Sequence, residues 1–197
     1  VHHHPMLFLT LGLLLFLGTH SVRIVADGWR TRTRDSLGAS RWRALYTLLS
    51  MLGFVLITWG FGQARQAPVQ LWSPPLGLRH LALLLTLLSF VLLAATYVPG
   101  NRIRARIRHP MSVAVMLWAL AHLLANGNLA HVVLFGTFLI WSVLVFLAAK
   151  ARDARDGSRY SKGTTGATGI TVALGVALWM ALTLWLHGLL IGVRPFG

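Results

Sequence analysis

Histidine is the residue type that could carry chemistry in this chain. Apart from an N-terminal run of three, the histidines lie within or beside long apolar segments: His20, His80, His109, His122, His131 and His187. An ionisable side chain in such a segment is costly to bury, so it is a functional candidate by default. Two inward-facing histidines on different helices are the usual ligands of a b-type haem, whereas a single one can simply hydrogen-bond across helices. The sequence leaves both roles open.

His20 and His122 are the first candidates for a ligand pair. By four-residue spacing, His20 shares a helical face with Phe16, and His122 shares one with Trp118 that we expect to point into a helical bundle. His109 precedes His122 on one predicted helix by about 20 Å along the axis, so these two cannot bind one ion together. The predicted spans also place His122 about 10 Å farther from the cytoplasmic side than His20. His20 with His109 is therefore an alternative pair.

Other chemistries lack the residues that they need. The chain has no cysteine, which excludes disulfides, thiolate nucleophiles, iron–sulfur clusters and covalently attached c-type haem. There is no glycine-rich phosphate loop and no H-E-x-x-H zinc motif. The carboxylates lie in or beside basic loops, outside the apolar segments, which disfavours a proton-coupled pump or a hydrolytic site: Asp27, Asp35, Asp153 and Asp156.

The elements that must position the histidines are helices that cross a membrane. Of the 197 residues, 56% are hydrophobic and only 11% are charged, against about 25% charged in soluble domains. A bilayer core of about 30 Å needs about 20 helical residues, and the uncharged blocks are long enough for six spans. We therefore predict an all-α polytopic membrane bundle of six helices: Met6–Val25, Arg43–Gly62, Leu78–Val98, Pro110–Ala125, Leu129–Ala149 and Gly169–Ile191.

The positive charges predict the orientation of this bundle. Of the 18 Lys and Arg residues, 15 fall at the first, third and fifth connections between spans and only 3 fall elsewhere. Loops rich in Lys and Arg stay on the cytoplasmic side, so we place both termini outside, in the inner membrane of a bacterium. This placement explains the net charge of +14 without nucleic-acid binding, and the basic loops can also hold anionic lipid headgroups.

The two ends of the chain carry further signals. Residues 1–5 contain the run His2-His3-His4 and are interpreted as the remnant of an expression tag, with residues 6–197 as a single domain. In the last predicted span, small residues recur every four positions and would let another helix approach closely: Gly169, Ala173, Ala177 and Ala181.

Several motifs resemble the NnrU family of membrane proteins. The first is Gly18-Thr19-His20-Ser21-Val22-Arg23-Ile24 in the first span. The second and most specific is Arg108-His109-Pro110-Met111 followed by Leu117-Trp118-Ala119-Leu120-Ala121-His122-Leu123-Leu124-Ala125-Asn126-Gly127. The third is the ending His187-Gly188-Leu189-Leu190-Ile191-Gly192-Val193.

The resemblance implies a haem b cofactor. Bacterial members are named for genes linked to nitrite and nitric oxide reduction, and the family includes zeta-carotene isomerase, a membrane haem enzyme that isomerises a cis double bond without net redox change. Its two haem ligands match His20 and His122, and another of its histidines matches His109. The isomerase has a cysteine where this chain has Ala119, so ligand exchange with a thiolate is excluded here.

Three functions follow as hypotheses. The first is a haem-b protein with His20 and His122 as axial ligands, acting on a polyene lipid or in nitrogen-oxide metabolism. The second is a non-enzymatic assembly subunit, docked through the small-residue stripe to a reductase component or to a second copy. The third is methyl transfer, because Arg108-His109-Pro110 is similar to a motif of isoprenylcysteine-type methyltransferases; Met111 replaces the tyrosine expected there.

Overall fold

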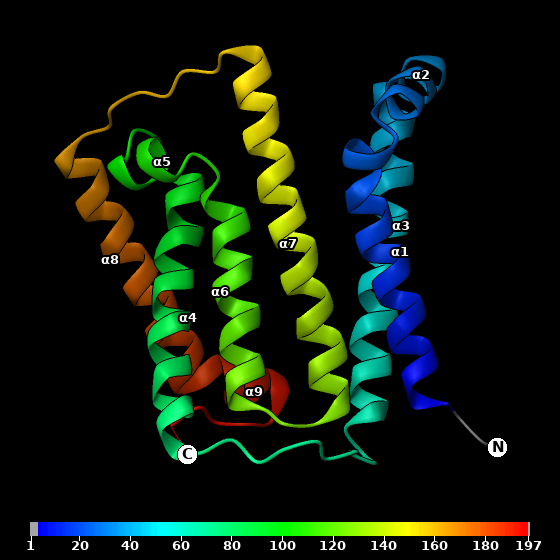
Figure 1. The fold of residues 1–197 in the computed structure, drawn as a ribbon, viewed down its shortest axis with the longest axis vertical. Helices are drawn as coiled ribbons and strands as arrows, with labels where there is room; N and C mark the ends of the chain where they lie inside the picture. The colour runs from blue at the N-terminus through cyan, green and yellow to red at the C-terminus, as the bar shows by residue number, and fades with distance from the viewer. Residues whose placement is uncertain (1–3, 197) are drawn as a thin grey trace. The chain divides into compact units, whose positions relative to one another are not determined.

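A computed structural model describes residues 4–196, and part of the predicted tag, Val1 to His3, lies outside the described residues. The described chain is mostly helical and contains two isolated β-bridges but no β-strand (Figure 1). The elements follow in the order α1 (Pro5–Val25), α2 (Asp27–Leu37), α3 (Ala39–Ala64), α4 (Leu76–Tyr97), α5 (Arg102–Ile107), α6 (Pro110–Ala125), α7 (Leu129–Asp156), α8 (Thr165–Ala181), the π-helical turn η1 (Leu182–Leu186) and α9 (His187–Ile191).

Five helical stretches are long and apolar enough to cross a membrane. They are α1, α3, α4, α7 and the continuous stretch Thr165–Ile191. The all-helical fold is confirmed among the described residues, with five candidate membrane spans, but the sixth predicted span, α6, has 16 residues and a length of about 24 Å, short of the bilayer core of about 30 Å. Its ends are set locally: Arg108 adopts a positive φ of 68° before Pro110, and Asn126 is extended. Six spans and the orientation of the termini stay predictions.

Two helices were not predicted because their residues are polar. The residues of α2 and of α5 were predicted to be basic loops, because the spans were predicted from hydropathy alone. Helix α2 ends at Gly38, whose φ of 86° favours glycine. Similarly, α7 continues past the apolar block to Asp156 and stops only at Gly157, where φ is 62°. Polar and charged residues therefore continue α7 beyond its predicted span and form the separate helix α2.

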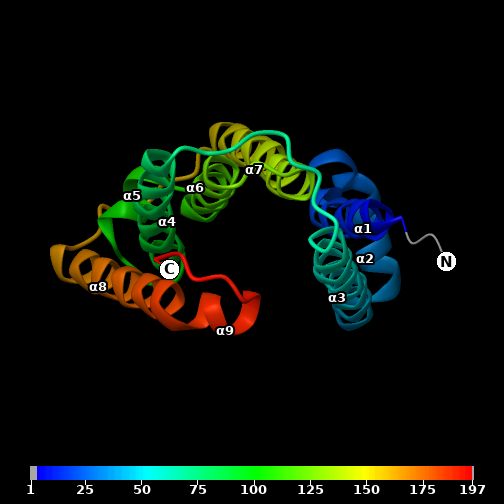
Figure 2. The same cartoon turned by 90° about the horizontal axis from the view of Figure 1, so that it is seen from below.

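The described residues group into two compact units, and each is treated separately. The first contains residues 1–72 and 128–137, and in it α1 packs along α3 (Figure 2). Three glycines bring the two backbones together. A Cβ atom on Gly60 would lie 2.2 Å from the backbone nitrogen of Leu9, and one on Gly12 would lie 2.5 Å from that of Ile57. A Cβ on Gly53 would lie 2.7 Å from the backbone nitrogen of Phe16, so a side chain fits at none of the three.

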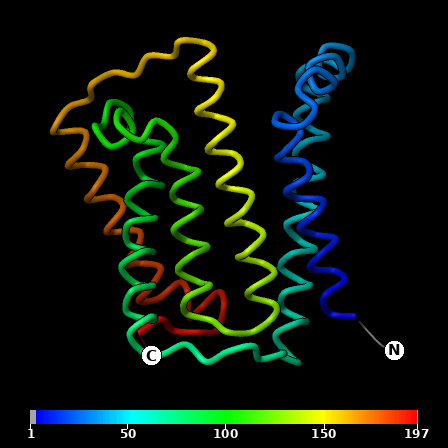
Figure 3. Tube along the Cα trace, viewed as in Figure 1, coloured from blue at the N-terminus to red at the C-terminus, as the bar shows by residue number. Residues whose placement is uncertain are grey.

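The second unit contains residues 73–127 and 138–197, with α4 between α6 and α8 (Figure 3). Ser89 on α4 donates a hydrogen bond to the carbonyl of Ala114 on α6 over 2.6 Å. Gly175 on α8 is buried against the backbone of Val91 on α4, where an added Cβ would lie 2.5 Å from the Cα atom. The indole of Trp179 donates to the hydroxyl of Thr86 over 3.0 Å. Close contacts and hydrogen bonds thus join these helices.

The small-residue stripe of α8 is not the face that packs on α4. Gly169, Ala173 and Ala177 are exposed, whereas Thr171 and Gly175 are buried. Two residues along a helix correspond to a rotation of about 200°, so these sets lie on nearly opposite faces. The hydroxyl of Thr171 donates to the carbonyl of Ala167 over 2.8 Å, which allows a polar side chain to turn inward. Apart from Ala181, which is half-buried, the predicted packing stripe therefore remains uncovered within this unit.

Asn101 is the polar anchor of the turn between α4 and α5. Its side chain is 1% exposed and makes three hydrogen bonds: it donates to the carbonyls of Ala95 and Val98 and accepts from the backbone nitrogen of Arg104. At about 1 kcal/mol for each bond, Asn101→Ala should lower the free energy of unfolding by about 3 kcal/mol, whereas Asn126→Ala, which loses one bond, should cost about 1 kcal/mol. Unfolding titrations in SDS measure both, and equal losses would contradict this account.

Candidate functional site

His20 is held near the C-terminal end of α1 by its own helix. Its Nδ1 atom pairs with the carbonyl of Phe16, four residues earlier, over 2.7 Å. The centroid of the His20 ring lies 4.2 Å from that of Phe16 and 5.4 Å from that of Tyr46 on α3. Because Gly53 packs directly on the backbone of Phe16, the contact between α1 and α3 also fixes the residue that orients His20.

His122 occupies the last turn of α6 and repeats this arrangement. Its Nδ1 atom pairs with the carbonyl of Trp118, four residues earlier, over 2.8 Å. The two ring centroids are 5.3 Å apart, and Trp118 in turn contacts Phe138 on α7 edge-on at 5.6 Å. The side-chain amide of Asn126 donates to the carbonyl of His122 over 2.9 Å, which satisfies one carbonyl at the end of the helix. The predicted face of Trp118, His122 and Asn126 is thus formed.

The two hydrogen bonds select one tautomer. A carbonyl oxygen can only accept, so Nδ1 carries the proton in His20 and in His122, and the lone pair of each neutral ring lies on Nε2. Metal-binding histidines commonly donate their other ring nitrogen to a carbonyl in this way. The same tautomer occurs in His131 and His187, whose Nδ1 atoms pair with Oδ1 of Asn128 and the carbonyl of Val193. The tautomer fits iron ligation, while the aromatic surroundings distinguish His20 and His122 from His187.

His109 is held in a different way. Its Nε2 atom contacts Oδ2 of Asp153 at 2.7 Å, and the hydroxyl of Tyr160 donates to the same oxygen over 3.0 Å. The side chains of His109 and Asp153 are only 22% and 11% exposed, and the guanidinium carbon of Arg108 lies 5.4 Å from the centre of the Tyr160 ring. In the neutral form, His109 therefore carries its proton on Nε2, the opposite of His20 and His122.

The partners of His109 were missed in the sequence because they lie far along the chain. Asp153 follows His109 by 44 residues and was assigned to a solvated basic loop. The available signal was the scarcity of carboxylates: with four acidic residues in the chain, a histidine near the same set of loops has few possible partners. The cluster of Arg108, His109, Asp153 and Tyr160 joins the start of α6, the end of α7 and the segment that follows it.

The structure brings some of the candidate histidines together and separates others. His109 and His122 lie at opposite ends of α6, about 20 Å apart, so they cannot share one ion. His122 lies within electrostatic range of His187 on α9 in the same unit, a neighbour that the sequence did not predict. His20 belongs to the first unit, so its pairing with His122 or with His109 stays a prediction. Among residues 4–196 no group of three or more His, Cys, Asp or Glu side chains could hold a metal ion.

Tyr160 provides a titration probe of the cluster. Burial is the main cause that raises its pKa, followed by the hydrogen bond to Asp153 and the charge of that carboxylate, against the opposing charges of Arg108 and Arg104. A raised pKa in the folded state means that the neutral phenol stabilises the fold below about pH 10, and that this contribution is lost as the pH rises through the raised value.

Asp153→Asn should therefore lower the pKa of Tyr160 towards its usual value, because the negative charge next to the phenol is removed. Tyrosinate absorbance near 295 nm measures this ionisation, and subtraction of the Tyr160→Phe curve isolates the one residue. Identical titrations of Tyr160 with and without Asp153→Asn would show that the contact does not exist in solution.

The comparisons with known proteins identify a family. A model of the family described as NnrU protein matches residues 8–195, which is nearly the whole chain and includes each candidate histidine discussed above. Searches of curated proteins and of solved structures found no match. The apolar helices agree with a membrane protein. This chain therefore belongs to the NnrU family.

Proposed function

We propose that this chain is a haem-b-binding protein of the bacterial inner membrane, with His20 and His122 as the axial ligands. The observation that supports this most directly is the matched hydrogen bond from Nδ1 of each ring to the carbonyl four residues earlier. That bond orients the ring and, in the neutral tautomer, places the lone pair on Nε2, the atom that would ligate iron. A chain without cysteine can supply two imidazoles but no thiolate ligand.

The residues around the two histidines suit an apolar cofactor. Phe16 and Tyr46 lie against the ring of His20, and Trp118 and Phe138 extend from His122. Such rings offer flat apolar surface and exclude water, and they hold the imidazoles in place before any ligand arrives. When bound, haem supplies an iron whose reduction potential is set by the ligands and by the polarity around it.

Two reactions are compatible with this proposal. One is the isomerisation of a polyene lipid, which would enter laterally from the bilayer; the other is a role in nitrite or nitric oxide metabolism. Product analysis separates them. An isomerase converts a cis-polyene into a product of the same mass without consuming a reductant, whereas nitrogen-oxide chemistry consumes electrons and changes the oxidation state of nitrogen.

The test of haem binding is an absorption spectrum of the protein, purified in mild detergent from cells supplied with a haem precursor. We expect a Soret band and, after reduction with dithionite, sharp α and β bands. The absorption spectrum of the pyridine haemochrome should identify the bound cofactor as haem b. Protein that stays colourless under these conditions, and that does not take up added haemin, would overturn the proposal.

A second candidate function rests on the exposed stripe of α8. Small residues that no helix of their own unit covers are the usual contact surface of a partner helix, which favours an assembly subunit of a reductase or a homo-oligomer. Ala177→Leu, towards the C-terminal part of the stripe, should then abolish co-purification of the partner or convert an oligomer to a monomer. Activity of the isolated monomer on a polyene would count against this candidate.

A further inference from the structure

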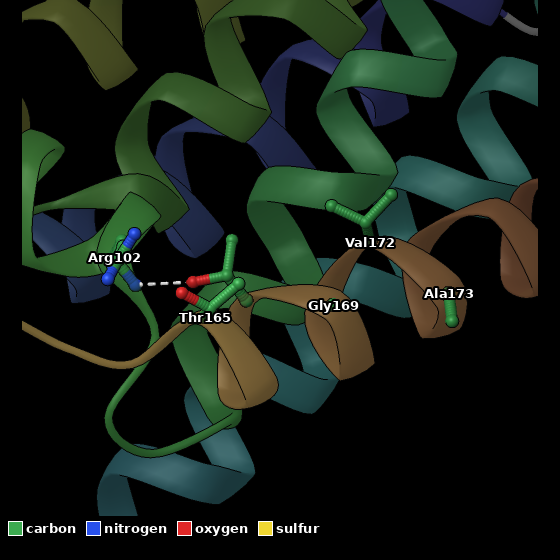
Figure 4. Close-up of a pocket in the computed structure, with 6 residues that line it drawn as sticks. Arg102, Thr165, Gly169, Val172 and Ala173 are labelled. Carbon is green, nitrogen blue, oxygen red and sulfur yellow. Dashed lines mark hydrogen bonds between the residues drawn. The ribbon is translucent and has the colours of Figure 1, made fainter.

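A groove of about 500 Å³ runs along the first turns of α8. Its surface is almost entirely apolar, and six residues line it: Arg102, Thr165, Thr168, Gly169, Val172 and Ala173. Figure 4 shows Arg102 of α5 at one end of this set and Ala173 at the other. The volume lies in the range of small-molecule sites. Because nearly all of this surface is apolar, Arg102 lines the groove mainly with the apolar part of its side chain, and the groove is an apolar floor next to an exposed arginine.

The charged end of the groove is held in place by backbone contacts. The backbone nitrogen of Arg102 donates to the hydroxyl of Thr168 over 2.9 Å, and this hydroxyl donates to the carbonyl of Thr164 over 2.7 Å. The backbone nitrogen of Thr164 donates to the carbonyl of Gly100 over 2.8 Å. Gly163, with a φ of 73°, leaves no room for a Cβ atom against Asn101 and Arg102. These hydrogen bonds thus join the start of α5 to the start of α8.

The guanidinium of Arg102 lacks an acidic partner. Among residues 4–196 it takes part in no ion pair, and the one carboxylate paired in the second unit, Asp153, contacts His109. Arg102 is exposed, and it belongs to a set of cations that includes Arg104, Arg106 and Arg108. A ligand for this groove must therefore combine a negative group with an apolar body.

An anionic phospholipid has that combination, and a second copy of this chain does not. A symmetric contact through this N-terminal part of the α8 stripe would bring two copies of the same arginine-rich segment together, with repulsion between like charges; the second candidate function concerns the C-terminal part, around Ala177. Membrane surfaces supply anionic headgroups next to basic residues, where each Lys or Arg contributes about 1 kcal/mol of attraction. The positive-inside rule expects this end of the unit to lie at that surface.

We propose that this groove binds one anionic phospholipid, with the phosphate at Arg102 and the upper part of an acyl chain along Gly169, Val172 and Ala173. Thr165, which is exposed, also lines the groove close to Arg102. The small residues Gly169 and Ala173 form the floor on which the acyl chain would lie. This site involves none of the proposed haem ligands, so it stands or falls independently of them.

The test is a lipid titration of the delipidated full chain in mild detergent, followed by native mass spectrometry. Phosphatidylglycerol is compared with phosphatidylcholine of the same acyl chains. We expect one tightly bound phosphatidylglycerol, and about a tenfold loss of its affinity in Arg102→Gln, as expected for one charge-assisted contact. Arg106→Gln is the matched control, because Arg106 is exposed on the same short helix and lines no part of the groove.

A second variant tests the apolar part without touching the charge. Nothing lies within 4 Å of a Cβ atom on Gly169, so Gly169→Leu should fill the floor, keep the fold and still lower lipid affinity. If Arg102→Gln and Arg106→Gln lost the same affinity for phosphatidylglycerol, the binding would depend only on the general positive charge of the surface, and the proposal would be overturned. The proposal would also be overturned if glycerol phosphate competed for the site as strongly as phosphatidylglycerol does. A dimer that Gly169→Leu dissociates, with no change in the amount of bound lipid, would overturn it as well.

Discussion

Gly60→Leu should be the most destabilising single substitution in the first unit. A Cβ atom at this position would lie 2.2 Å from the backbone nitrogen of Leu9 and 2.8 Å from its Cα atom, so the new side chain meets backbone that cannot rotate away. Overpacking usually costs 1–3 kcal/mol, and because two helix backbones must separate here we expect at least about 3 kcal/mol. Unfolding in SDS, monitored by circular dichroism, measures the loss.

Gly62→Leu is the matched control on the same helix. Nothing lies within 4 Å of a Cβ atom there, and replacing glycine in a helix should be neutral or stabilising by up to about 1 kcal/mol. Gly12→Ala, which meets the backbone of Ile57 at 2.5 Å, should fall between the two variants. If Gly60→Leu and Gly62→Leu unfold alike, α1 and α3 do not make the close contact described here.

His122→Ala should remove most of the bound haem. Under the proposed ligation, this variant loses one of two iron bonds, together with the orienting contact from the carbonyl of Trp118. We expect the haem content of the purified protein to fall by at least tenfold, which corresponds to about 1.4 kcal/mol or more of binding free energy. His20→Ala should behave in the same way, because its ring has the matched hydrogen bond to Phe16.

Two other histidines serve as controls for this result. His131 has the same tautomer as His122 and also packs on aromatic rings, those of Phe61 and Phe135, but it is not one of the proposed ligands. His131→Ala should therefore retain haem. His187 lies within electrostatic range of His122 in the same unit. Loss of haem in His187→Ala but not in His20→Ala would replace the proposed pair by His122 and His187.

Hydropathy predicted the long helices because lipid-facing residues and buried residues are both apolar. For that reason it could not predict which face of α8 packs. The small residues suggested one face, yet α4 contacts the opposite one, where Gly175 permits close approach and Thr171 satisfies its hydroxyl within its own helix. It also missed α2 and the polar end of α7, since helix formation there does not depend on hydropathy and the two helices end only at Gly38 and Gly157.

The candidate site was predictable in part. Four-residue spacing placed Trp118 beside His122 and Phe16 beside His20, because neighbours on one helix follow from its geometry. Contacts between helices do not follow from spacing. The pairing of His109 with Asp153 joins the start of α6 to the end of α7, and His187 of α9 lies within electrostatic range of His122 on α6. Only the fold brings these residues together.

Electron paramagnetic resonance of the oxidised protein at low temperature tests the central claim most directly, because the spin state of ferric haem reports its axial ligands. Ligation by two imidazoles predicts a low-spin signal in the unchanged chain, conversion of any remaining haem to high spin in His20→Ala and in His122→Ala, and no change in His131→Ala. A high-spin signal in the unchanged chain, or a low-spin signal that survives both substitutions, would contradict ligation by His20 and His122.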